Sequence, residues 1–143
     1  MKLEVANQMT MQQLCDYAIE KLVEQGGRCL TSGENDEGYN GAGSFNCAYG
    51  MGAKHCGIGW MLDEENDKLM KEVCGVTELI NSCPKHLPSA ILENPGLATW
   101  FQILHDGPSE RGREECLHRL RKKYNLDISN PAYHQWVDMG EKA

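Results

Sequence analysis

Cysteine and histidine are the residues of this sequence that could serve as metal ligands, nucleophiles or general bases. Four of the seven cysteines form two pairs with the same spacing, Cys47 with Cys56 and Cys74 with Cys83. Four thiolates would suit a tetrahedral zinc ion, but neither pair has the close spacing that most zinc sites use. We therefore favour buried cysteines that act as small apolar side chains, with no metal and no other cofactor, and keep structural zinc as the alternative.

His105 and Asp106 are neighbours at the end of a segment with helical periodicity. With a cysteine nucleophile they would supply a general base and its orienting carboxylate. Adjacent side chains on a helix point about 100° apart, so we expect that Asp106 does not orient His105. We favour a histidine stabilised by the dipole or the carbonyls of the helix C-terminus, and a functional His105 stays open.

A glycine-rich acidic segment, residues 31–44, is predicted to be a long loop. It is too polar to be kept for packing and too long for a simple connection, so we expect binding residues on it. The acidic residues do not have the spacing of a calcium loop, and the glycines match no nucleotide-binding motif. Shortening residues 33–43 is expected to abolish binding and leave stability nearly unchanged.

Residues 46–62 are predicted to form a β-hairpin that turns at Met51 and Gly52. In that register Cys47 lies opposite Cys56, and Ala48 lies opposite His55. Trp60 lies at the second strand after two glycines, and an aromatic face of this kind suits ligand binding. No residue is assigned as catalytic. The candidate ligand-binding or partner-binding residues are Tyr39, Asn40, His55, Trp60 and His105.

The remaining pattern predicts an α+β fold: a mostly helical single domain over residues 1–143 with one small β-hairpin or sheet. The first helix begins after a capping box at Thr10 and ends at Gly26. Further helices are expected over 63–73, 76–83, 95–106, 109–124 and from about 131 onward. One face of the 95–106 helix is predicted to be the centre of the core: Leu97, Trp100, Phe101 and Leu104.

The formal net charge of −7 argues against non-specific nucleic-acid binding, and no apolar run is long enough to cross a membrane. An odd number of cysteines without an export signal favours reduced thiols in a cytoplasm. A homo-oligomer stays open. One basic cluster is interpreted as the solvated face of a helix: Arg111, Arg113, His118, Arg119, Arg121, Lys122 and Lys123.

The hairpin and the later FQILHD segment together resemble a family of small bacteriophage and prophage proteins. The family pattern has a C-x-Y strand, matched by Cys47 and Tyr49, and a C-x-x-G strand, matched by Cys56 and Gly59. An L-Q-x-x-H-D helix end follows, which Gln102, His105 and Asp106 match. The chain departs from this pattern at Trp60 and Met61, and in the length of its glycine-rich loop. The resemblance implies a phage origin and the cytoplasm of an infected bacterial host, but no chemistry.

Two classes of function follow from these observations. The first is a non-catalytic accessory binding protein that inhibits a host protein, for example a defence protein, or sequesters a small host molecule such as a nucleotide signal. The second is a small enzyme that uses a cysteine or His105 on a host metabolite or protein, with one thiol far more reactive than the others. The lack of a recognisable catalytic motif favours the first.

Overall fold

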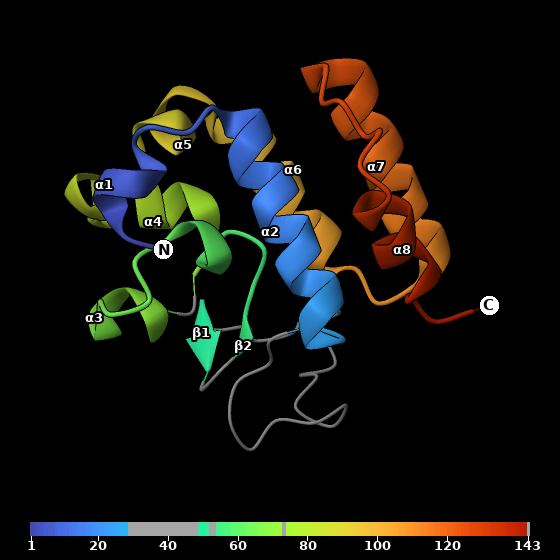
Figure 1. Ribbon diagram of the computed structural model, residues 1–143, viewed down its shortest axis with the longest axis horizontal. Coiled ribbons are helices and arrows are strands. Elements are labelled where there is room, and N and C mark those ends of the chain that lie inside the picture. The colour runs from blue at the N-terminus through green and yellow to red at the C-terminus, as the bar shows by residue number, and fades with distance from the viewer. Residues whose placement is uncertain (29–48, 52–53, 73, 143) are drawn as a thin grey trace.

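The computed structural model describes residues 1–28, 49–51, 54–72 and 74–142, and within them it is mostly helical (Figure 1). In chain order the helices are α1 (Leu3–Ala6), α2 (Met11–Gln25), α3 (Asp67–Met70), α4 (Val76–Ser82), α5 (Ser89–Glu93), α6 (Pro95–Asp106), α7 (Glu110–Tyr124) and α8 (Ala132–Asp138). Two short 3-10 turns, η2 (Gly59–Met61) and η3 (Pro84–His86), join them. The predicted α+β class, mostly helical with one small sheet, is confirmed.

The small sheet is an antiparallel pair, β1 (Gly50–Met51) and β2 (Lys54–His55). Its register corrects the predicted one, because His55 pairs with Gly50 and not with Ala48. Met51 likewise pairs with Lys54, so each pair is shifted by two residues from the expected register. Glycine-rich strands define their register weakly, so contacts elsewhere decide it. One such contact is at Gly59, where a Cβ atom would come within 1.9 Å of the Tyr49 carbonyl oxygen.

Helix α2 has the boundaries that its local signals predict. The Thr10 hydroxyl accepts a hydrogen bond from the Gln13 backbone, and the Gln13 side chain accepts one from the Thr10 backbone, which completes the capping box. Gly26 ends the helix with a φ of 83°, a left-handed conformation that glycine adopts without strain. The position of Gln25, the last helical residue, is thus fixed by the sequence next to it.

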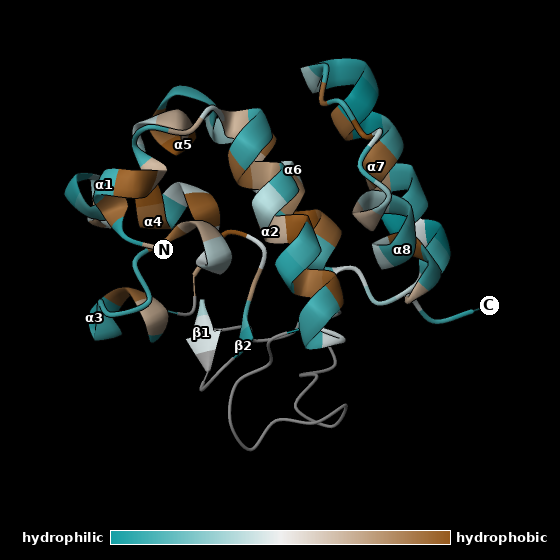
Figure 2. Ribbon diagram, in the orientation of Figure 1, coloured by the Kyte–Doolittle hydropathy of each residue, from teal (hydrophilic) through white to brown (hydrophobic). Residues whose placement is uncertain are grey.

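The core is centred on α6, which packs between α4 and α7 (Figure 1). Leu97, Phe101 and Leu104 are buried as predicted, whereas Trp100 is only half-buried at the edge of the core. Trp136 of α8 is fully buried, and its indole nitrogen donates to the Leu104 carbonyl at 2.9 Å. Figure 2 shows the matching pattern, with hydrophobic residues on the inner sides of the helices and hydrophilic residues outside.

Three of the observed helices differ from the predictions. Helix α3 begins at Asp67 and not at Asp63, because the Asn66 side chain accepts a hydrogen bond from the Leu69 N–H and caps the helix there. The short helices α1 and α5 were not predicted, because each has too few residues for a clear periodicity.

Among the described residues, no helix is both long enough and apolar enough to cross a membrane.

Candidate functional site

His55 lies at the end of β2 with almost no solvent exposure, at 5%. Its Nδ1 atom is 3.3 Å from the Tyr49 carbonyl oxygen, and its Nε2 atom is 3.5 Å from the Glu64 carboxylate. Both ring nitrogens therefore face acceptors, although a neutral imidazole has only one N–H to donate. The ring sits between the first strand of the hairpin and the acidic segment that follows η2.

The surroundings of His55 have opposing effects on its pKa. Burial lowers the pKa and is the largest effect, while the contacts with Tyr49 and Glu64 raise it and the N-terminal ammonium lowers it further. The net result is a pKa below the usual 6.5. His55 is therefore a neutral, fixed part of the structure at neutral pH.

Gln25 holds the hairpin against the end of α2. Its Oε1 atom accepts hydrogen bonds from the His55 backbone at 3.0 Å and from the Trp60 indole at 3.1 Å. Its Nε2 atom donates to the His55 carbonyl at 2.8 Å. Sequence reasoning missed Gln25, since a glutamine at the end of a helix carries no pattern that distinguishes it from other polar residues.

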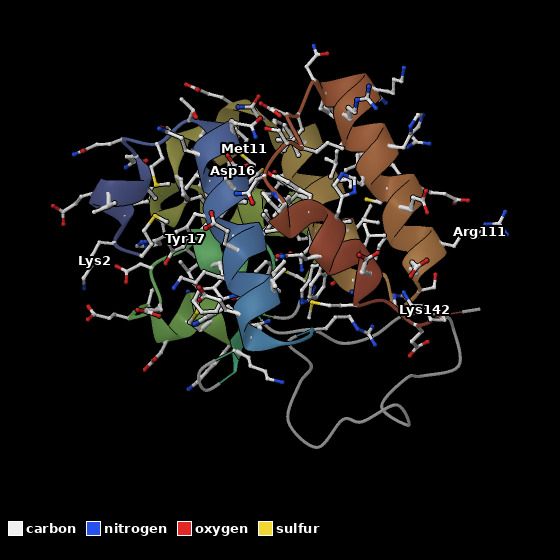
Figure 3. The ribbon with its side chains drawn as sticks, turned by 45° about the vertical axis from the view of Figure 1, so that its right-hand side comes forward. Lys2, Met11, Asp16, Tyr17, Arg111 and Lys142 are labelled. Carbon is white, nitrogen blue, oxygen red and sulfur yellow. The ribbon has the colours of Figure 1, made fainter. Side chains whose placement is uncertain are left out.

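Trp60 completes this arrangement and adds exposed aromatic surface. Its ring packs edge-on against His55, with the centroids 4.4 Å apart, and it is half-buried. The Lys21 ammonium lies 5.9 Å from the Trp60 ring centroid and 5.7 Å from that of Tyr17. Tyr17 lies on the outer side of α2 in Figure 3. We call Tyr17, Lys21, Gln25 and Trp60 the hairpin surface, which the buried His55 supports through its contact with Trp60.

The structure therefore brings together two of the five predicted site residues, His55 and Trp60. Tyr39 and Asn40 lie outside the described residues, as does the predicted loop, and so does Cys47 of the first cysteine pair. Tyr17 and Lys21 were not singled out in the sequence. A helix face with an aromatic residue and a lysine four positions apart was the available signal.

His105 is fully buried and lies apart from the hairpin surface. Its ring is stacked on Trp136, with the planes 9° apart and the centroids 6.1 Å apart. Its Nδ1 atom is 2.8 Å from the Asp106 carboxylate, which corrects the expectation that Asp106 does not orient it. Asp106 is the last residue of α6, where its side chain is partly exposed and can turn back toward its neighbour.

A second contact connects the C-terminal end of α6 with the segment after the hairpin. Gln102 accepts a hydrogen bond from the Ile58 N–H at 3.0 Å, and its amide lies 3.5 Å from the Asp106 carboxylate. A Cβ atom on Gly57 would lie 3.0 Å from the Phe101 ring, so a larger residue there would require the ring to shift by a few tenths of an ångström. Gln102 thus positions the segment after the hairpin, and both Gln102 and His105 are buried.

The described cysteines are largely buried. Cys74 precedes α4 and Cys83 follows its last residue, and Cys83 lies near enough to help raise the pKa of the Cys74 thiol. Burial raises the pKa of the Cys74 thiol, and it raises that of Cys116 to about 12. The Cys56 sulfur accepts a hydrogen bond from the Gly59 N–H at 3.2 Å. Within the described ranges, no group of three His, Cys, Asp or Glu side chains is arranged to hold a metal ion.

One residue of the predicted basic cluster is not solvated. Arg113 is 4% exposed, and it donates to the carbonyls of Gly107 and Trp136, both at 2.7 Å. Its guanidinium lies 4.0 Å from the Trp136 ring centroid. Burial, with the nearby charge of Arg28, lowers the Arg113 pKa to about 10. Arg113 is therefore a structural residue that satisfies carbonyls after the end of α6 and in α8.

No family model matches this chain, and no curated protein or solved structure matches it either.

Proposed function

We propose that this protein is a non-catalytic accessory binding protein of phage type, which inhibits a host protein by occupying its surface in the cytoplasm of an infected bacterial cell. The observation that carries the proposal is the fixed position of Trp60 on the hairpin surface. Three hydrogen bonds to Gln25 hold Trp60 and His55 in place before any partner arrives. Preorganised aromatic side chains lower the entropy cost of association.

The composition of the hairpin surface supports a role in protein binding. Tyrosine and tryptophan are enriched among the residues that contribute most to protein interfaces. The Lys21 ammonium lies close to the rings of both Tyr17 and Trp60. The surface therefore offers two partly exposed aromatic side chains and the Lys21 ammonium, which also pairs with the Glu24 carboxylate at 3.4 Å.

The reactive groups that the structure describes support binding over catalysis. A catalytic cysteine needs an accessible thiol with a lowered pKa. Burial instead raises the pKa of the thiols of Cys15, Cys74 and Cys116. His105, the other predicted reactive residue, is fully buried.

The surface shape supports a protein partner more than a small molecule. Small-molecule sites are concave and mostly apolar. Two of the larger depressions among the described residues, of about 400 and 440 Å³, are open and have charged walls. Sequestration of a small host molecule such as a nucleotide is the alternative.

The test is affinity capture from a bacterial lysate followed by reconstitution with the purified partner. The Lys21→Glu variant is expected to lose the partner, while Lys68→Glu, which changes net charge equally on α3, is expected to retain it. Equal capture by both variants would place the site elsewhere. Native mass spectrometry of the purified protein reports a bound nucleotide or a homo-oligomer in the same preparation, and either result without a captured protein would contradict the proposal.

A second candidate function is a cysteine- and histidine-dependent enzyme, and the 2.8 Å contact between His105 and Asp106 favours it. This alternative requires one cysteine to react much faster than the others in the native protein. Quantitative iodoacetamide labelling with peptide mapping measures this directly. Labelling that appears only on denaturation would exclude the enzyme.

A further inference from the structure

Helices α6 and α7 form a second surface with a distinct chemistry. Trp100 is half-buried on α6, and the Arg119 guanidinium of α7 lies 4.3 Å from its ring centroid. One turn further along α6, Ile103 is 40% exposed, a high value for a large apolar side chain. Lys123 lies one turn beyond Arg119, 5.7 Å from the Tyr124 ring centroid. We call Trp100, Ile103, Arg119 and Lys123 the α6–α7 surface.

The positive charge of the molecule is concentrated on α7. This helix contains six of the fourteen lysines and arginines of the chain, but only three of its twenty-one acidic residues. Arg113 is buried, and Arg111, which extends into solvent in Figure 3, pairs with Glu115 at 3.4 Å. Within the part of the chain that the structure describes, four exposed cations of α7 have no acidic partner: Arg119, Arg121, Lys122 and Lys123.

The geometry at Trp100 determines which ligand groups fit. Arg119 covers one face of the indole, so a nucleic-acid base would have to displace it in order to stack there. A guanidinium that stacks on a ring still presents its N–H edge to solvent, and that edge matches a carboxylate.

We propose that the α6–α7 surface binds an acidic polypeptide segment of a partner protein. Carboxylates of the segment pair with Arg119 and Lys123, and one apolar side chain covers Ile103. Charge complementarity sets the orientation, and burial of Ile103 adds apolar contact area. None of the residues that define the hairpin surface takes part, so this proposal does not depend on the proposed function.

The test uses a fluorescein-labelled synthetic peptide in which glutamates alternate with leucines, and measures its fluorescence anisotropy with the full-length protein. The double variant Arg119→Glu with Lys123→Glu is expected to weaken binding by at least about tenfold. The matched control, Lys68→Glu with Lys85→Glu, makes the same change in net charge at exposed positions of α3 and η3. It is expected to change the affinity by no more than about twofold.

Two further measurements distinguish direct contact with the α6–α7 surface from a long-range effect of net charge. Ile103→Asp changes an exposed residue. It is expected to weaken peptide binding without changing the melting temperature of the protein. A peptide with glutamine in place of every glutamate is expected not to bind. Equal weakening by the two double variants, tighter binding of a labelled oligothymidine than of the acidic peptide, or no binding of the acidic peptide at low salt would each overturn the proposal.

Discussion

Gln25 and His55 exchange two hydrogen bonds, one in each direction, between the last side chain of α2 and the backbone of β2. The same Gln25 oxygen also accepts the Trp60 indole N–H. These bonds connect residues thirty or more positions apart in the sequence. The end of α2, the second strand and the 3-10 turn after it therefore form one unit.

Replacing Gln25 tests that unit. Gln25→Ala leaves the buried N–H and carbonyl of His55 without their partner, and we expect a loss of roughly 1 to 3 kcal/mol in the free energy of unfolding. Urea unfolding followed by circular dichroism measures it. The neighbouring exposed residue provides the control, with Glu24→Ala expected within about 0.5 kcal/mol of the wild type. A Gln25→Ala variant as stable as the control would contradict the assignment.

His55 should make stability depend on pH. Its pKa is lowered on folding, so the unfolded chain binds its proton more readily than the native protein does. The contribution is fully present above the unfolded value of 6.5 and is lost as the pH falls from there toward the lower folded value. His55→Gln is expected to flatten this part of the stability profile, measured by urea unfolding at several pH values. His118→Gln, at an exposed position of α7, serves as control, and unchanged slopes in both variants would rule the effect out.

Arg113 should matter for stability despite lying in a run of surface charges. Arg113→Met removes the donors to the Gly107 and Trp136 carbonyls, and we expect a loss of at least about 2 kcal/mol. Arg121→Met, at an exposed position of the same helix, should change stability by less than about 0.5 kcal/mol. Thermal unfolding of the two variants side by side makes the comparison, and similar melting temperatures would show that Arg113 is not a buried donor.

Phe101 tests the centre of the core. It is fully buried and lies against Gly57, so Phe101→Ala is expected to cost roughly 3 to 5 kcal/mol. Ile103→Ala, on the exposed side of α6, is expected to cost less than about 1 kcal/mol. Calorimetry should show one cooperative transition for the wild type, as a single domain requires. A small loss for Phe101→Ala would mean that the inner face of α6 is assigned wrongly.

Local sequence signals predicted the longer helices α2, α6 and α7, because the signals that begin and end them are local. The capping box at Thr10, the glycine at residue 26 and the serine cap at residue 109 act on backbone groups within a few positions. The hairpin register was predicted wrongly because its glycines carry little side-chain information.

The candidate site was only partly predictable, since long-range contacts create it. Nothing near Gln25 in the sequence indicates that it bonds to His55 and Trp60. Arg113 could have been recognised, because it lies four residues before Leu117 on the buried stripe of α7. The contact between His105 and Asp106 depends on the end of a helix, where the usual separation of adjacent side chains no longer holds.

The measurement that tests the proposed function most directly is site-specific photo-crosslinking in a bacterial extract. A benzophenone amino acid replaces Tyr17 on the hairpin surface, and in a separate variant it replaces Lys85 on η3. If the hairpin surface binds a host protein, the Tyr17 probe gives one discrete cross-linked protein and the Lys85 probe does not. No cross-linked product from Tyr17, or equal yields from both positions, would contradict the proposal.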